Sequence, residues 1–171
     1  MTIQDVLELR DYFVETGLGL RFYSYQRIVS DKIITALLTR SGEEIPIEIS
    51  RQAGKTEAIV CTLAFLMVFA KTLTKRFWGH EAPFRFIIFS PQKEQSKTDF
   101  DRLKSYLNKL KRNGGWDGLV DAAESNQTTL QLTNGSYCYI FPLTPTSNPE
   151  SKSADLIIYE EAHKIIDQEK K

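Results

Sequence analysis

Apolar residues recur at helical spacing through the first forty residues of the chain. One such run covers residues 3–16 and ends before Gly17, which favours the end of a helix. A second run covers residues 25–38 and ends before Gly42. We therefore expect a helical N-terminal segment over residues 1–44.

From residue 45 onward, strand patterns alternate with helical ones. A short strand is expected over residues 46–49, and the strongest strand pattern covers residues 84–89. The helix between them is apolar on nearly all sides, so it must be covered on most of its surface. Another long helix follows, and its apolar residues recur at helical spacing: Phe100, Leu103, Tyr106, Leu107 and Leu110.

A hairpin and one more strand complete the pattern. Residues 128–132 and 136–141 flank Asn134-Gly135, a pair typical of two-residue hairpin turns. Residues 156–159 form the last apolar run. The alternation predicts an α/β fold with a mainly parallel central sheet flanked by helices, over residues 45–171.

Composition excludes several classes of protein. The chain has 171 residues, of which 42% are hydrophobic, so a single packed domain is expected. Its 22 basic and 22 acidic side chains give a formal net charge of zero, which excludes binding of nucleic acid by bulk charge. Two cysteines and two histidines without metal-site spacing exclude a zinc or disulfide framework.

The most apolar run, residues 58–70, is 13 residues long. A bilayer needs about 18 or more, so we interpret this run as a buried core helix. We expect a cytoplasmic protein that does not contact a membrane.

Gly54, Lys55 and Thr56 lie where an apolar strand meets the buried helix. A glycine at a helix N-terminus lets backbone N–H groups approach phosphate oxygens. Lys55 can neutralise β- and γ-phosphates, and the Thr56 hydroxyl can ligate Mg²⁺. The usual pattern has a further glycine where this chain has Ile49, so the triplet alone is a weak signal, and its strand–helix context favours phosphate binding.

Two carboxylates, Glu160 and Glu161, follow the last apolar run. Ligands bind at the carboxyl ends of strands in open α/β sheets. One carboxylate can hold Mg²⁺ and the next can activate a water molecule. The alternative is that both acids merely open a following helix, where they suit the helix dipole.

Tyr25 and Gln26 precede these motifs. The Gln26 amide can read both the donor and the acceptor edge of adenine, while a ring beside it stacks on the base. The alternative is a solvent-facing glutamine beside core aromatics.

These motifs together resemble those of large terminase subunits, the DNA-packaging motors of tailed bacteriophages. Residues 50–56 (SRQAGKT) resemble the family's deviant Walker A motif, in which Arg-Gln precedes a small residue and Gly-Lys-Ser/Thr. Residues 156–163 resemble its Walker B strand, and residues 84–92 resemble the strand and turn that follow the phosphate-loop helix. The resemblance covers residues 20–165 and implies a RecA-like P-loop (ASCE) ATPase that uses ATP and Mg²⁺.

The resemblance also implies individual roles. Lys55 corresponds to the phosphate-binding lysine, Thr56 and Glu160 to the Mg²⁺ residues, and Glu161 to the catalytic carboxylate. Arg51 corresponds to an arginine finger acting in cis, with a plain phosphate contact or salt bridge as the alternative. The implied nucleotide-binding residues are Tyr25, Gln26, Ser50, Arg51, Gln52, Ala53, Gly54, Lys55 and Thr56. Glu160 stands where the family has Asp and is one methylene longer.

Family members continue to a coupling motif and an RNase H-like nuclease domain. Because this chain ends at Lys171, we expect a monomeric fragment with a nucleotide site and no nuclease activity. In the complete motor, the implied partners are double-stranded DNA, a portal protein and a small terminase subunit, with a homo-oligomeric ring on the procapsid.

Two other functions fit the same motifs. Glu160-Glu-Ala-His163 also resembles the DEAH box of superfamily-2 helicases, so the chain can be interpreted as a first RecA-like helicase domain. A nucleotide-gated interaction module would bind ATP without hydrolysing it.

Overall fold

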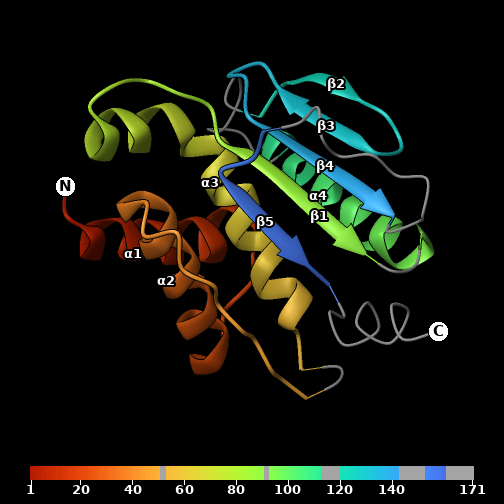
Figure 1. Ribbon diagram of the computed structural model, residues 1–171, viewed down its shortest axis with the longest axis horizontal. Helices are drawn as coiled ribbons and strands as arrows, with labels where there is room; N and C mark the ends of the chain where they lie inside the picture. The colour runs from red at the N-terminus through yellow and green to blue at the C-terminus, as the bar shows by residue number, and fades with distance from the viewer. Residues whose placement is uncertain (51–52, 91–92, 113–119, 143–152, 161–171) are drawn as a thin grey trace.

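A computed structural model describes residues 1–50, 53–90, 93–112, 120–142 and 153–160 (Figure 1). Within them the chain forms an α/β fold in which helices pack beside an open five-stranded sheet, with strand order β2-β3-β4-β1-β5. The predicted α/β class is thereby confirmed.

The N-terminal segment is helical, as predicted. Helix α1 (Ile3–Tyr12) begins with a capping box, because Thr2 and Asp5 bond to each other's backbone N–H. It continues into a π-helical turn, η1 (Phe13–Gly17). Helix α2 (Ser24–Thr39) follows and ends at Arg40, which adopts a left-handed conformation.

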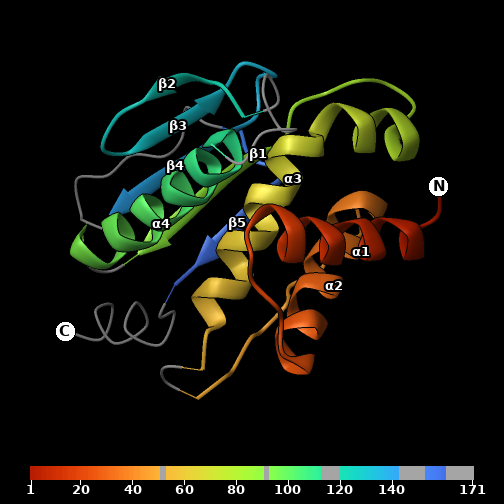
Figure 2. The same cartoon turned by 180° about the vertical axis from the view of Figure 1, so that it is seen from behind.

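Two long helices cover one face of the sheet (Figure 2). They are α3 (Lys55–Trp78) and α4 (Lys93–Arg112). Helix α3 is long and apolar enough to cross a membrane by length and composition alone, but 72% of its most apolar window is buried inside the fold. The buried core helix expected over residues 58–70 is therefore part of α3.

The sheet is mixed, which corrects the mainly parallel sheet expected. Strand β1 (Arg85–Ser90) lies between β4 (Tyr137–Pro142) and β5 (Leu156–Tyr159), and both neighbours are parallel to it. Strands β2 (Ala122–Ser125) and β3 (Thr129–Leu132) extend the sheet with antiparallel pairings. The mixture follows from the hairpins, since strands joined by a tight turn must run antiparallel.

The predicted hairpin is confirmed, and one strand had no sequence signal. Gly135 in the β3–β4 turn has φ of 93°, a conformation that favours glycine. Strand β2 contains too few apolar residues to show strand periodicity. It is instead positioned by Asn126, whose side chain accepts hydrogen bonds from the N–H groups of Thr128 and Thr129 and closes the turn between β2 and β3.

The strand expected over residues 46–49 is wrong. These residues are described but pair with no strand among the described residues. Ile45, Ile47 and Ile49 instead pack half-buried against the core. The alternating pattern therefore reflects one-sided packing of extended backbone, and Pro46 lacks an N–H group to donate to a sheet.

As a result, β5 is the edge strand of the sheet among the described residues, and two of its side chains are exposed. Ile157 is 47% and Tyr159 is 56% exposed. Tyr159 stacks on Phe89 of β1, which also contacts Phe141 of β4. No described helix covers this aromatic face of the sheet, which is opposite α3 and α4 (Figures 1 and 2).

Hydrogen exchange tests the correction at residues 46–49. We expect the amides of Ile47 and Ile49 to exchange at least about 100-fold faster than those of Ile87 and Ile88 in β1, because only the β1 amides are held in a sheet. Exchange resolved by residue with NMR measures both pairs in one sample. Equal protection of the two pairs would restore the expected strand.

Candidate functional site

The phosphate-loop motif leads directly into α3. Gly54 precedes the first helical residue, Lys55, and has φ of 75°. This backbone conformation favours glycine, and a Cβ atom at Gly54 would lie 2.5 Å from Nε2 of Gln26, so a side chain here would displace the Gln26 amide. Before it, the N–H of Ala53 bonds to the carbonyl of Ser50 at 3.2 Å. The local structure therefore favours glycine at the helix N-terminus.

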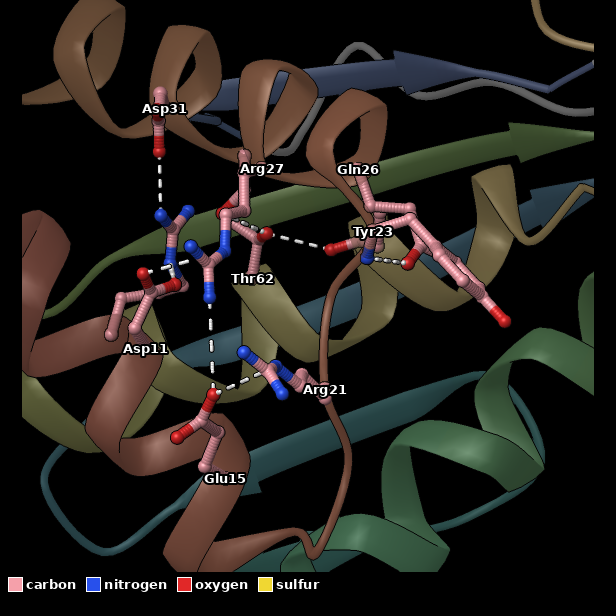
Figure 3. A network of polar contacts seen from close by, with 11 residues as sticks. Asp11, Glu15, Arg21, Tyr23, Gln26, Arg27, Asp31 and Thr62 are labelled. Atoms are coloured by element: carbon pink, nitrogen blue, oxygen red, sulfur yellow. Dashed lines mark hydrogen bonds and ion pairs between the residues drawn. The ribbon is translucent and has the colours of Figure 1, made fainter.

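Two side chains of α2 hold this loop. The Gln26 amide donates to the Gly54 carbonyl at 3.0 Å, and the Tyr25 hydroxyl donates to the Ala53 carbonyl at 2.8 Å. The Gln26 carbonyl oxygen also accepts the N–H of Tyr23 at 2.9 Å (Figure 3). The structure thus brings the two upstream motif residues to the phosphate loop, where Gln26 is buried and attached to its backbone. Contact with adenine stays a prediction.

An ionic network holds α2 against the first helices (Figure 3). Arg10 of α1, which is 1% exposed, bonds to Asp31 of α2 at 2.6 Å. Arg27 of α2 faces Asp11 at 3.6 Å and Glu15 at 3.8 Å. These pairs connect elements on both sides of the turn before α2, so they fix the helix that carries Tyr25 and Gln26.

A buried hydrogen bond joins α2 to α3. The Thr62 hydroxyl of α3 lies 2.7 Å from the Ser30 hydroxyl of α2. Both residues are fully buried. The first half of α3 is thereby held against the helix that supports the phosphate loop.

Glu160 meets the first turn of α3 from the far end of the chain. It directly follows β5, and its N–H bonds to the Phe89 carbonyl of β1 at 2.9 Å. Its Oε1 accepts a hydrogen bond from the Thr56 hydroxyl at 3.5 Å, across 104 positions of sequence. The fold therefore brings together the two residues that the resemblance implies as Mg²⁺ ligands, and their role as ligands stays a prediction.

The position of Glu160 depends on how β5 begins. Arg85 of β1 forms a two-armed salt bridge with Asp155, with Nε–Oδ2 and Nη2–Oδ1 distances of 3.0 and 2.9 Å. The backbone N–H of Arg85 also donates to Asp155. The side-chain hydrogen bond to Asp155, and then the charge of that carboxylate, raise the pKa of Arg85. The pair sets the register of β5 on β1 one residue before the strand starts.

Asp99 belongs to none of the sequence motifs, yet it lies at this site. This residue of α4 is 6% exposed and its carboxyl lies within hydrogen-bonding reach of Glu160. Burial, then the contact with Glu160 and its charge, raise the pKa of Asp99 to about 8, against the opposing charges of Arg102 and Lys55. The sequence does contain a signal for a buried acid here, because Asp99 lies four positions before Leu103 on the apolar stripe of its helix.

One oxygen of each acid has no hydrogen-bond donor among the described residues: Oδ2 of Asp99 and Oε2 of Glu160. Buried carboxylate oxygens of this kind suit a hard divalent cation such as Mg²⁺. With the Thr56 hydroxyl beside them, the residues present fit the cation that accompanies a nucleotide.

The remaining predicted site residues lie outside the described part of the chain. They are Arg51, Gln52 and Glu161. The described ones are Ser50, Ala53, Gly54, Lys55 and Thr56, and the last two are the first residues of α3. No described group of three or more histidine, cysteine or acidic residues forms a metal cluster.

Two exposed aromatic rings lie beside the loop. Tyr23 and Tyr25 stack with a centroid separation of 5.7 Å and an interplanar angle of 7°. Tyr23 is 68% exposed. It also lines a surface hollow of about 500 Å³ with Arg21, Phe22, Ser24 and Arg27. A flat apolar ligand can reach these rings from solvent.

Comparison with known protein families and with curated proteins finds no match for this chain.

The hydrogen bonds that Gln26 makes at the loop before α3 contribute measurably to the free energy of unfolding. We expect Gln26→Ala to lower the free energy of unfolding by about 1–2 kcal/mol, because the partly buried Tyr23 N–H loses its acceptor and the Gly54 carbonyl keeps only the hydrogen bond from the Ala58 N–H. Urea denaturation measures the change. Gln4→Ala on exposed α1 is the control and should change the value by less than about 0.5 kcal/mol. Equal stability of Gln26→Ala and wild type would show that the contact does not hold the loop.

Asp99 makes stability depend on pH. Its folded-state pKa lies above the ordinary value of 3.8, so its stabilising contribution is complete below that value and is lost as the pH rises through about 8. Asn cannot ionise, so Asp99→Asn should flatten this fall and be at least about 1 kcal/mol more stable than wild type at pH 8. Urea denaturation between pH 4 and 8 measures it, with exposed Asp101→Asn as control. Parallel profiles for wild type and Asp99→Asn would contradict the assignment.

Proposed function

We propose that this chain binds ATP together with Mg²⁺ and hydrolyses it. The observation that carries the proposal is the contact between Thr56 at the start of α3 and the buried Glu160 at the end of β5. Lys55 lies beside them, close enough for its charge to act on Asp99. A helix N-terminus, a lysine, a hydroxyl and a buried carboxylate at one point are the groups that nucleoside triphosphate hydrolysis requires.

Each group has a definite task in this proposal. Backbone N–H groups at the start of α3 bind phosphate oxygens, which the partial positive charge of the helix N-terminus favours. Lys55 neutralises the β- and γ-phosphates. Thr56 and Glu160 hold Mg²⁺, which supplies further neutralisation of phosphate charge when bound.

Glu161 is the proposed general base. It directly follows Glu160 in sequence and would orient a water molecule and accept its proton as the water oxygen attacks the γ-phosphorus. The bond between the γ-phosphorus and the bridging oxygen breaks, and ADP leaves. Arg51 is proposed to stabilise the charge on the transferred phosphoryl group.

For the adenine base we propose a place beside Tyr25 and Gln26. The stacked Tyr23 and Tyr25 rings are exposed and face solvent next to the loop, and an aromatic face binds a base by stacking. If Gln26 also reads the base, Gln26→Ala will reduce the preference for ATP over GTP. If Gln26 only holds the loop, the affinities for both nucleotides will fall together.

We further propose that the chain is a RecA-like ATPase domain and that it powers DNA translocation in a terminase motor. Support comes from the Arg-Gln form of the Walker A motif and from the parallel arrangement of β4, β1 and β5 with a helix before β1. The missing strand at residues 46–49 is a departure from that fold. The proposed partners remain double-stranded DNA, a portal protein and a small terminase subunit.

Lys55→Ala tests the nucleotide site. We expect ATP affinity to fall about 10- to 100-fold, because a charged hydrogen bond to phosphate is lost, and hydrolysis to fall at least about 100-fold. Titration with a fluorescent ATP analogue and a phosphate-release assay measure the two effects. Lys71→Ala, an exposed lysine on the same helix, is the matched control. Wild-type affinity and turnover in Lys55→Ala would exclude the phosphate-loop assignment.

A further inference from the structure

Two acids from different elements meet inside the fold. Asp99 comes from α4 and Glu160 from the end of β5, and they are 6% and 5% exposed. Their carboxyl groups lie within hydrogen-bonding reach of each other. Glu160 also contacts the Thr56 hydroxyl of α3, so three elements bring three oxygen-bearing side chains to one point.

Neither acid forms an ion pair with a lysine or arginine among the described residues, although two cations lie near enough for their charge to reach Asp99. Oδ2 of Asp99 and Oε2 of Glu160 face no donor among the described residues. The nearby guanidinium of Arg102 is paired with Glu57 at 3.3 Å. Lys55 is the other cation whose charge reaches Asp99, and the proposed function assigns it to phosphate. Two buried carboxylates are costly unless a proton or a cation lies between them.

The length of Glu160 fits a bridging position. Glu160 is one methylene longer than Asp, and its side chain meets both Thr56 in the first turn of α3 and the carboxyl of Asp99. A P-loop site commonly holds Mg²⁺ with one hydroxyl and one carboxylate, so most of the ligands come from water and phosphates. A second carboxylate adds charge that does not depend on the nucleotide.

We propose that Asp99 is a second carboxylate ligand of the divalent-cation site, and that Asp99, Glu160 and Thr56 bind the cation before a nucleotide is present. The identity of the cation as the Mg²⁺ of the nucleotide rests on the proposed function. The binding of a cation by the nucleotide-free protein does not rest on the proposed function. The cation and then ATP therefore bind in sequence, and the buried acids are neutralised in the nucleotide-free protein.

A titration with Mn²⁺ tests this proposal. The full chain is titrated without nucleotide, and electron paramagnetic resonance measures the concentration of unbound Mn²⁺. We expect wild type to bind one Mn²⁺ and Asp99→Asn to bind it about 10- to 100-fold more weakly. Asp101→Asn makes the same charge change on exposed α4 surface and should stay within about two-fold of wild type. Far-ultraviolet circular dichroism checks that each variant folds.

A change in metal preference distinguishes two roles for Asp99: a ligand of the cation, or a residue that only positions Glu160. Asp99→Cys should bind Cd²⁺ more tightly than wild type and Mn²⁺ more weakly, because a thiolate ligand favours soft metals. Wild type measured with Cd²⁺ corrects for Cys61 and Cys138. Loss of Mn²⁺ binding with no gain for Cd²⁺ would overturn the ligand role.

The outcomes distinguish this proposal from the proposed function. Equal Mn²⁺ affinity in wild type and Asp99→Asn, or no Mn²⁺ binding by wild type, overturns the role of Asp99 even if Lys55→Ala abolishes nucleotide binding. Mn²⁺ binding that depends on Asp99, together with unchanged nucleotide affinity in Lys55→Ala, supports the cation site and excludes the ATP site.

Discussion

The parallel pairing of β5 with β1 is the interaction on which the candidate site depends. It carries Glu160 from a distant part of the sequence to the start of α3, and the Glu160 N–H continues the pairing by bonding to Phe89. The salt bridge between Arg85 and Asp155 fixes where that pairing begins. A shift of one residue would turn Glu160 to the other face of the sheet, away from Thr56.

A second constraint comes from charge. Asp99 and Glu160 are buried side by side, and the helix N-terminus and Lys55 provide positive charge next to them. Such an arrangement is a poor way to stabilise a fold, because like charges repel and their desolvation is costly. It is typical of a site that binds a cation and a polyanion together, where each ligand offsets the charge of the protein groups facing it.

Much of the fold could be predicted because its signals are local. The N-terminal helices follow from apolar periodicity, and the β3–β4 hairpin follows from Asn134-Gly135. Strand β2 was missed because its position depends on the side chain of Asn126 and not on its own pattern. The strand at residues 46–49 was wrong because alternation shows which residues are buried but not whether the backbone has a partner.

Part of the candidate site could also be predicted, because some of its residues lie in local sequence motifs. Gly54, Lys55, Thr56 and Glu160 form recognisable motifs, and the structure brings Thr56 and Glu160 together. Asp99 belongs to no motif, so only its place on an apolar helix stripe marked it. The attachment of Gln26 to Gly54 depends on the packing of α2 against α3, which a sequence pattern does not specify.

The central claim is that Lys55, Thr56 and Glu160 form one site for a nucleotide and its cation. The most direct test is a crystal structure of the chain with Mn²⁺ and a non-hydrolysable ATP analogue, using the anomalous signal of Mn²⁺ to locate the ion. We expect the triphosphate at the N-terminus of α3, in contact with Lys55, and the Mn²⁺ peak between Thr56 and Glu160. A nucleotide bound elsewhere, or an ion that touches neither residue, would contradict it.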